Sequence, residues 1–189
     1  MKNKKKDWLL WSLLILAIIG TVVMLGVVIP AQQQKKREQE EAYRIQQSDA
    51  LTHDITAIQP YRNAYMGNAS NTGHLFGALP LAQYWDGFSM DSEALSVQIN
   101  YKVRAATLDQ AELRRNMIYD AVASMAALDN LEQVIFSFQD QSIAYTRTQV
   151  KKAMGDDLSQ LLDDNNWAEK VQSRLEEEAF LKSFEDSEV

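Results

Sequence analysis

Leu95-Ser-Val-Gln-Ile-Asn-Tyr-Lys-Val-Arg104 is the stretch that decides the fold of this chain. Apolar residues occupy every second position and polar residues lie between them, which is the period of a strand with one buried face. The preceding stretch, Tyr84 to Met90, is predicted to be its hairpin partner across the turn Asp91-Ser92-Glu93. The sequence therefore places a sheet in the middle of the chain.

A long helix and a second hairpin are predicted after this strand. Thr107 and Gln110 have the spacing of a capping box, and the helix that they open is expected to run to about Leu128. Val134 to Phe138 and Ser142 to Thr146 indicate the second hairpin. This order predicts an α+β domain in which an antiparallel sheet of about four strands packs one face on the long helix.

The apolar positions of these elements are expected to form a single core. Strand alternation and helical spacing place nine of them together. They are Val97, Ile99, Tyr101, Leu113, Met117, Met125, Val134, Phe136 and Phe138.

The other strong signal is a run of 22 residues without a charge, Trp8 to Ile29. A helix of this length would cross a hydrocarbon core of about 30 Å, so we expect a single-pass transmembrane helix with the lipid bilayer as its partner. Lysines in the first six residues favour a cytoplasmic N-terminus, residues 1–7, and an extracytoplasmic C-terminal domain in the cell membrane. A signal peptide is the alternative, but the run is long and no cleavage motif follows it.

The rest of the chain is divided by its composition into three predicted parts. Residues 30–60 are assigned to a helical stalk, because Ala31 to Ser48 is rich in Gln, Glu, Lys and Ala without an apolar stripe. A dimeric coiled coil is the alternative there, although no heptad pattern is sustained. Residues 61–165 are assigned to the α+β domain, and residues 166–189 to a C-terminal helix and acidic tail.

Charge and cysteine content exclude several classes of function. Ser48 to Val189 contains 11 Lys and Arg against 22 Asp and Glu, a net charge of −11. Nucleic acid is therefore not expected as a partner, because its binding requires clustered basic residues. The chain has no cysteine, which excludes disulfides, thiolate metal sites and cysteine nucleophiles.

Catalytic and metal-binding patterns are sparse. The two histidines, His53 and His74, are too few for a zinc site made of histidines, and no HExxH motif occurs. Ser70 and His74 are four residues apart, as in a pair on one helix face, but the GxSxG turn of a serine hydrolase is missing. The acid pairs Asp156-Asp157 and Asp163-Asp164 lack the calcium-loop pattern. We expect no catalytic residue, metal or cofactor, with a hydrolase as the alternative.

Tyr84, Trp85 and Phe88 are the candidate binding residues. In a strand, neighbouring side chains lie on opposite faces, so a core on one face cannot bury both Tyr84 and Trp85. One of the three aromatic side chains is therefore predicted to be exposed and to anchor a partner. The alternative interpretation is structural, with one ring in the core and another covering a sheet edge.

The order and spacing of short motifs between Tyr61 and Leu162 resemble a known family, the domain of unknown function numbered 4825. The motifs are Tyr65 to Asn68, Asn71, Leu79-Pro80, Val97 to Tyr101, Asn116, Leu128 to Leu131, Val134 to Phe136, Tyr145 and Gly155 to Leu158. The resemblance implies an extracytoplasmic domain behind a membrane anchor in Gram-positive bacteria. It implies no reaction and no binding residues.

These observations together favour a membrane-anchored, extracytoplasmic interaction or sensing module without catalysis. A protein or another component of the cell envelope is the expected partner. An accessory subunit of a membrane protein complex is the first alternative, and a hydrolase is the second.

Overall fold

The computed structural model describes residues 4–184, and the chain divides after Arg44 into two compact units. Residues 1–3 of the predicted cytoplasmic segment and residues 185–189 of the predicted acidic tail lie outside the described part. The second unit begins at Ile45 and contains the sheet, the candidate binding residues and the segments after residue 165.

The N-terminal segment is helical but does not form the predicted spanning helix. Helix α1 (Lys4–Val23) is followed by a π-helical segment, η1 (Met24–Val28), and then by α2 (Ile29–Gln47). The uncharged run is thus divided over three elements, and its part in α1 is shorter than the roughly 20 residues of a spanning helix. Within residues 4–184 we find no helix with the length and apolar character needed to cross a membrane. The predictions of a transmembrane helix and of a single-pass membrane location are therefore wrong.

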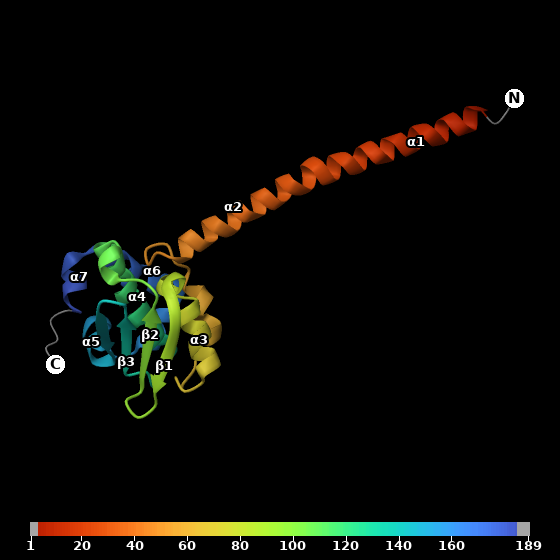
Figure 1. The fold of residues 1–189 in the computed structure, drawn as a ribbon. Helices are drawn as coiled ribbons and strands as arrows, with labels where there is room; N and C mark the ends of the chain where they lie inside the picture. Colours follow the sequence, from red (N-terminus) through yellow and green to blue (C-terminus); the bar gives the residue numbers. More distant parts are fainter. Residues whose placement is uncertain (1–3, 185–189) are drawn as a thin grey trace. The chain divides into compact units, whose positions relative to one another are not determined.

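Residues 4–184 contain a four-stranded sheet in the order β1-β2-β3-β4 (Figure 1). The strands are β1 (Trp85–Asp91), β2 (Ser96–Tyr101), β3 (Gln133–Ser137) and β4 (Ser142–Thr146). The two hairpins are antiparallel as predicted, but β2 and β3 are parallel, so the prediction of an antiparallel sheet is wrong. The long connection between β2 and β3 passes through helix α4 (Gln110–Ala127) and returns the chain to the end of the sheet where β2 begins. β3 can therefore run in the same direction as β2.

The core lies between the sheet and the helices around α4. All nine residues predicted to be buried together are buried there. α4 is buried almost all round between Asn116 and Ala127, because the segments after residue 157 cover the side that faces away from the sheet. These segments are η5 (Leu158–Leu162), α6 (Asp164–Lys170), η6 (Gln172–Glu176) and α7 (Glu178–Lys182).

The short helices at the two sides of the sheet hold the outer strands. Helix α3 (Ala69–Gly77) lies beside β1, and α5 (Arg147–Met154) lies on the opposite side, next to β4 (Figure 1). α5 begins with a capping box between Thr146 and Gln149. α4 begins two residues later than predicted, because Asp109 rather than Thr107 is its N-cap.

A buried carboxyl group links α4 to the segment that leads into β1. Asp120 is 1% exposed, and its Oδ2 accepts a hydrogen bond of 3.3 Å from the backbone N–H of Leu81, at the start of η3 (Pro80–Tyr84). Its Oδ1 has no hydrogen-bond partner among the described residues. Desolvation raises the pKa of this carboxyl well above its ordinary value, although the bond from Leu81 acts in the opposite direction. The fold therefore favours the protonated acid.

Asp120→Asn is expected to remove a pH dependence from the stability of the protein. Below about pH 3 the side chain is mostly protonated in both the folded and the unfolded chain. As the pH rises, the unfolded chain loses this proton first, so the free energy of unfolding falls by up to about 1.4 kcal/mol per pH unit until the folded group ionises. Asparagine cannot titrate, so the variant gains stability relative to the parent as the pH rises.

Urea unfolding of both proteins between pH 4 and pH 7 measures this difference. All other titrating groups are shared by the two proteins and cancel to first order. A stability difference that stays constant across this range would show that Asp120 ionises normally in the folded chain.

Candidate functional site

One wall of the candidate site is helix α3, which hydrogen bonds fix to the preceding loop. Asn68 caps the helix by accepting from the backbone N–H of Asn71 at 3.1 Å. The side-chain amide of Asn71 donates to the carbonyl oxygen of Tyr61 at 2.7 Å, and Thr72 Oγ1 donates to the carbonyl oxygen of Met66 at 2.7 Å. Tyr61, the last residue of η2 (Ile55–Tyr61), is therefore held beside α3.

The opposite wall is the first half of β1. Trp85 is paired with Tyr101 and Phe88 with Ile99, and paired residues share a sheet face. A register shift between Trp85 and Gly87 adds one residue to β1, which brings Trp85 and Phe88 to the same face despite their odd spacing. Their ring centroids are 5.9 Å apart.

Two glycines on α3 let these rings approach the helix closely. A Cβ atom at Gly73 would lie 3.1 Å from Cε1 of Phe88, and one at Gly77 would lie 3.1 Å from Cζ3 of Trp85. Larger side chains at these positions would push both rings outward. The two glycines therefore allow the rings of Trp85 and Phe88 to pack directly on the backbone of α3.

An open groove of about 430 Å³ lies between the two walls. Tyr61 and His74 stack at its rim, with ring centroids 5.7 Å apart and planes inclined by 26°. The groove is mainly apolar and aromatic, and none of its described lining residues is Asp, Glu, Lys or Arg. The lining residues are Tyr61, Ala69, Ser70, Gly73, His74, Gly77, Ala78, Trp85 and Phe88.

The polar groups of the groove are not arranged as a catalytic pair. Ser70 and His74 both line it, as their spacing on α3 requires, but no hydrogen bond joins them within the described structure. A serine nucleophile needs a base within hydrogen-bonding reach. The described residues also contain no group of three or more His, Asp or Glu side chains placed to hold a metal ion.

The other histidine is buried and held by neighbours. His53 Nε2 lies 2.8 Å from the carbonyl oxygen of Ala78, which can only accept, so this nitrogen carries the proton. Nδ1 is then free to accept from the hydroxyl of Tyr119 at 2.7 Å. Burial lowers the pKa of His53 and favours this neutral form. His53 therefore joins α4 to the end of α3.

Two of the three predicted binding residues line the groove. Trp85 and Phe88 do, whereas Tyr84 borders a separate cavity of about 20 Å³ beside Glu112 of α4. All three side chains are half-buried, so the prediction that one would be exposed is wrong. Strand alternation does not apply to Tyr84 and Trp85, because Tyr84 ends the 3-10 helix η3 and only Trp85 belongs to the strand.

The α3 side of the groove was not predicted from the sequence. Tyr61, Gly73 and Gly77 were not identified as functional residues, although the four-residue spacing of the glycines could have indicated a bare helix face. Tyr61 had no comparable local signal, because it reaches the site through the hydrogen bond from Asn71.

Residues 58–149 match the family described as "Domain of unknown function (DUF4825)". The match confirms the family resemblance predicted from the sequence, and it spans both walls of the groove and all four strands of the described sheet. No curated protein and no solved structure matches the chain. The chain therefore carries a DUF4825 domain.

Proposed function

We propose that this chain is a non-catalytic interaction or sensing module whose groove between α3 and β1 takes an apolar group of its partner. The observation that carries the proposal is an aromatic groove of about 430 Å³, a volume within the usual range of ligand sites. Both walls belong to the matched domain, and each is fixed by hydrogen bonds or strand pairing. Such a site needs little rearrangement on binding, which lowers the cost of association.

The chemistry of the lining favours an uncharged group as the occupant. The walls offer ring faces and carbon edges, together with the small polar groups of Ser70 and His74. A charged group placed there would lose hydration without gaining a charged partner from the described lining. Burial of an aromatic or aliphatic side chain contributes about 1.5–3 kcal/mol.

The absence of cysteine from the sequence permits a direct test by disulfide exchange. The Ser70→Cys variant carries its one thiol at the groove, on the exposed side of α3. It is equilibrated with the symmetric disulfide of 2-phenylethanethiol, or with that of 2-mercaptoethanol as a polar reference, in the same thiol–disulfide buffer. The Cys thiolate attacks this disulfide, one thiol leaves, and the other half stays on the protein as a mixed disulfide. Mass spectrometry measures the fraction of protein that retains each fragment.

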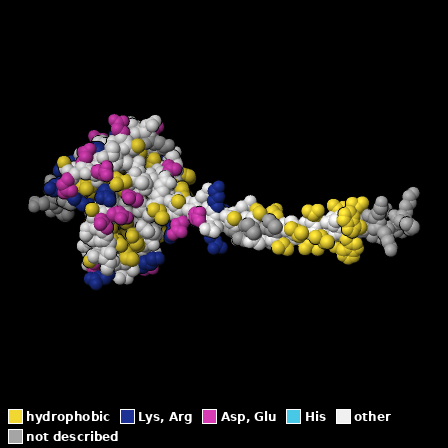
Figure 2. Space-filling model, turned by 90° about the horizontal axis from the view of Figure 1, so that it is seen from above, with side chains coloured by type: hydrophobic (Ala, Val, Ile, Leu, Met, Phe, Trp, Pro, Cys, Tyr) yellow, Lys and Arg dark blue, Asp and Glu magenta, His cyan; other side chains and the backbone are white. Residues whose placement is uncertain are grey.

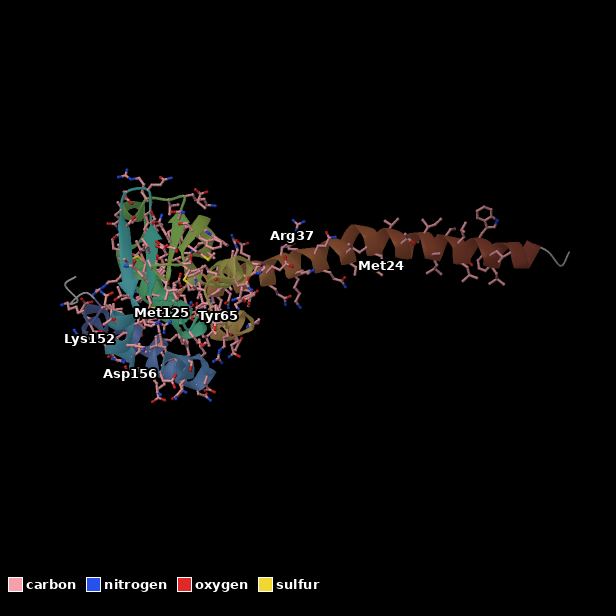
Figure 3. All side chains as sticks on the ribbon, turned by 90° about the horizontal axis from the view of Figure 1, so that it is seen from below. Met24, Arg37, Tyr65, Met125, Lys152 and Asp156 are labelled. Carbon is pink, nitrogen blue, oxygen red and sulfur yellow. The ribbon has the colours of Figure 1, made fainter. Side chains whose placement is uncertain are left out.

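Lys152→Cys is the matched control, because Lys152 is exposed on α5 and lies on the far side of the domain from Tyr65, which precedes α3 (Figure 3). We expect the ratio of retained phenyl fragment to retained polar fragment to be about ten- to hundredfold higher for Ser70→Cys than for Lys152→Cys. This factor follows from the free energy of burying the phenyl ring. Equal preferences in the two variants would contradict the proposed function.

A further inference from the structure

The groove adjoins a strand edge with unused hydrogen-bonding capacity. β1 is at one end of the sheet order, and β2 is its one strand neighbour in the described part of the chain. Beyond that pairing and the bond from the backbone N–H of Trp85 to the carbonyl oxygen of Ala82, no other backbone-to-backbone hydrogen bond involves residues 85–91 within the described structure. Every second residue of an edge strand directs its N–H and C=O away from the sheet, so β1 can accept another strand.

The groove lies on the face of β1 where an added strand would place side chains. Trp85 and Phe88 project from that face toward α3. A new strand would lie about 4.8 Å from β1, and alternate side chains would point to this same face. One side chain of the added strand can therefore enter the groove while its backbone bonds to β1.

The charges of β1 indicate the chemistry of the partner. The two charged residues of the strand are both acidic, Asp86 and Asp91, and both are exposed. They belong to a region, Ser48 to Val189, whose net charge is −11, and acidic side chains are spread over the face in Figure 2. Pairing between two copies through β1 would bring these acids together, whereas a partner with basic residues would be attracted.

We infer that the groove receives an extended peptide, which adds as a strand to the free edge of β1. This inference rests on the proposed function. An apolar side chain of the peptide enters the groove, and Lys or Arg residues on either side of it face Asp86 and Asp91. Backbone hydrogen bonds then supply affinity, and the groove selects the side chain, as in other cases of strand addition.

Random ten-residue peptides displayed on phage and selected against the full-length chain are the probe. We expect enrichment of an apolar residue flanked by Lys or Arg. The strongest peptide is then synthesised with one N-methylated backbone amide at a time, and each affinity is measured. N-methylation at every second position should weaken binding at least tenfold, while the positions between should tolerate it, because alternate residues bond to the strand.

Variants of the chain test the two recognition elements separately. Ser70→Trp places a large ring in the groove and should weaken peptide binding at least tenfold, whereas Lys152→Trp should leave it unchanged. Asp86→Asn should weaken binding about two- to fivefold at low salt, in keeping with an exposed ion pair. Asp156→Asn removes an exposed acid from another part of the domain and should have no effect (Figure 3).

The outcomes separate this inference from the proposed function. A peptide that is sensitive to Ser70→Trp but shows no alternation in the N-methyl series would leave the groove as a binding site and overturn strand addition. Failure to enrich any peptide would overturn the inference, and the disulfide-exchange experiment would still decide the proposed function. Sedimentation experiments could also show a dimer of the chain that dissociates when the peptide is added. That result would identify a second copy of the chain as the occupant and overturn the inference of a basic peptide partner.

Discussion

Arg147→Met is expected to lower the free energy of unfolding by about 3–5 kcal/mol. Arg147, at the start of α5, is 9% exposed and donates to three backbone carbonyl oxygens where α4 ends. Its Nε bonds to Leu131 at 2.7 Å, and its second guanidinium nitrogen bonds to Met125 at 3.0 Å and to Leu128 at 2.6 Å. The carbonyls of Met125 and Leu128 are among those that the end of α4 leaves without an intrahelical partner, and the carbonyl of Leu131 belongs to the loop that follows.

Methionine has a similar length but no donor, so the variant keeps the packing and leaves these carbonyl oxygens unsatisfied. Chemical denaturation of the variant and the parent measures the loss. Arg104→Met is the control, since Arg104 is 62% exposed in its ion pair with Asp140, and it should cost less than about 1 kcal/mol. A loss of similar size for both variants would show that Arg147 does not act as the cap of α4.

Phe136→Ala is expected to cost about 3–5 kcal/mol, because it removes a fully buried ring from the middle of the sheet. Phe136 on β3 is 0% exposed and lies between Tyr101 and Tyr145 on the neighbouring strands. Its ring centroid is 6.4 Å from that of Tyr101 and 5.9 Å from that of Tyr145. Both rings would border the cavity that alanine leaves.

Ile135→Ala is the matched control on the same strand. Ile135 is half-buried on the opposite face of the sheet, where its neighbours are Gln98 and Ala144. Its truncation should cost about 1 kcal/mol. Thermal or urea unfolding compares the two variants, and equal losses would mean that β3 does not direct Phe136 into the core.

Local periodicity was enough to predict the strands and the core, but not the direction of pairing. Val97, Ile99 and Tyr101 alternate with polar residues, and all three are buried as the period requires. The same period is compatible with parallel or antiparallel neighbours, so it could not show that β2 and β3 run in the same direction. That direction depends on where α4 returns the chain to the sheet.

The apolar run at the N-terminus was misread for a related reason. Hydropathy describes the composition of Trp8 to Ile29, but it does not fix where each helix of the folded chain begins and ends. α1 ends at Val23, where the π-helical segment Met24–Val28 begins.

Only one wall of the candidate site was predicted, because the other wall has a weaker local signal, the spacing of its two glycines. Trp85 and Phe88 are conspicuous aromatic residues beside the clearest strand. The other wall depends on contacts between residues that are distant in the chain, such as the hydrogen bond from Asn71 to Tyr61 and the approach of Gly77 to Trp85. Sequence spacing carries no information about such contacts.

A crystal structure of the Ser70→Cys variant joined by a disulfide to 2-phenylethanethiol tests the central claim most directly. The account predicts the phenyl ring inside the groove, in contact with Trp85 and Phe88 and beside the glycines of α3. A ring that lies in solvent, or that packs on a surface outside the lining residues, would contradict the claim that this groove takes an apolar group.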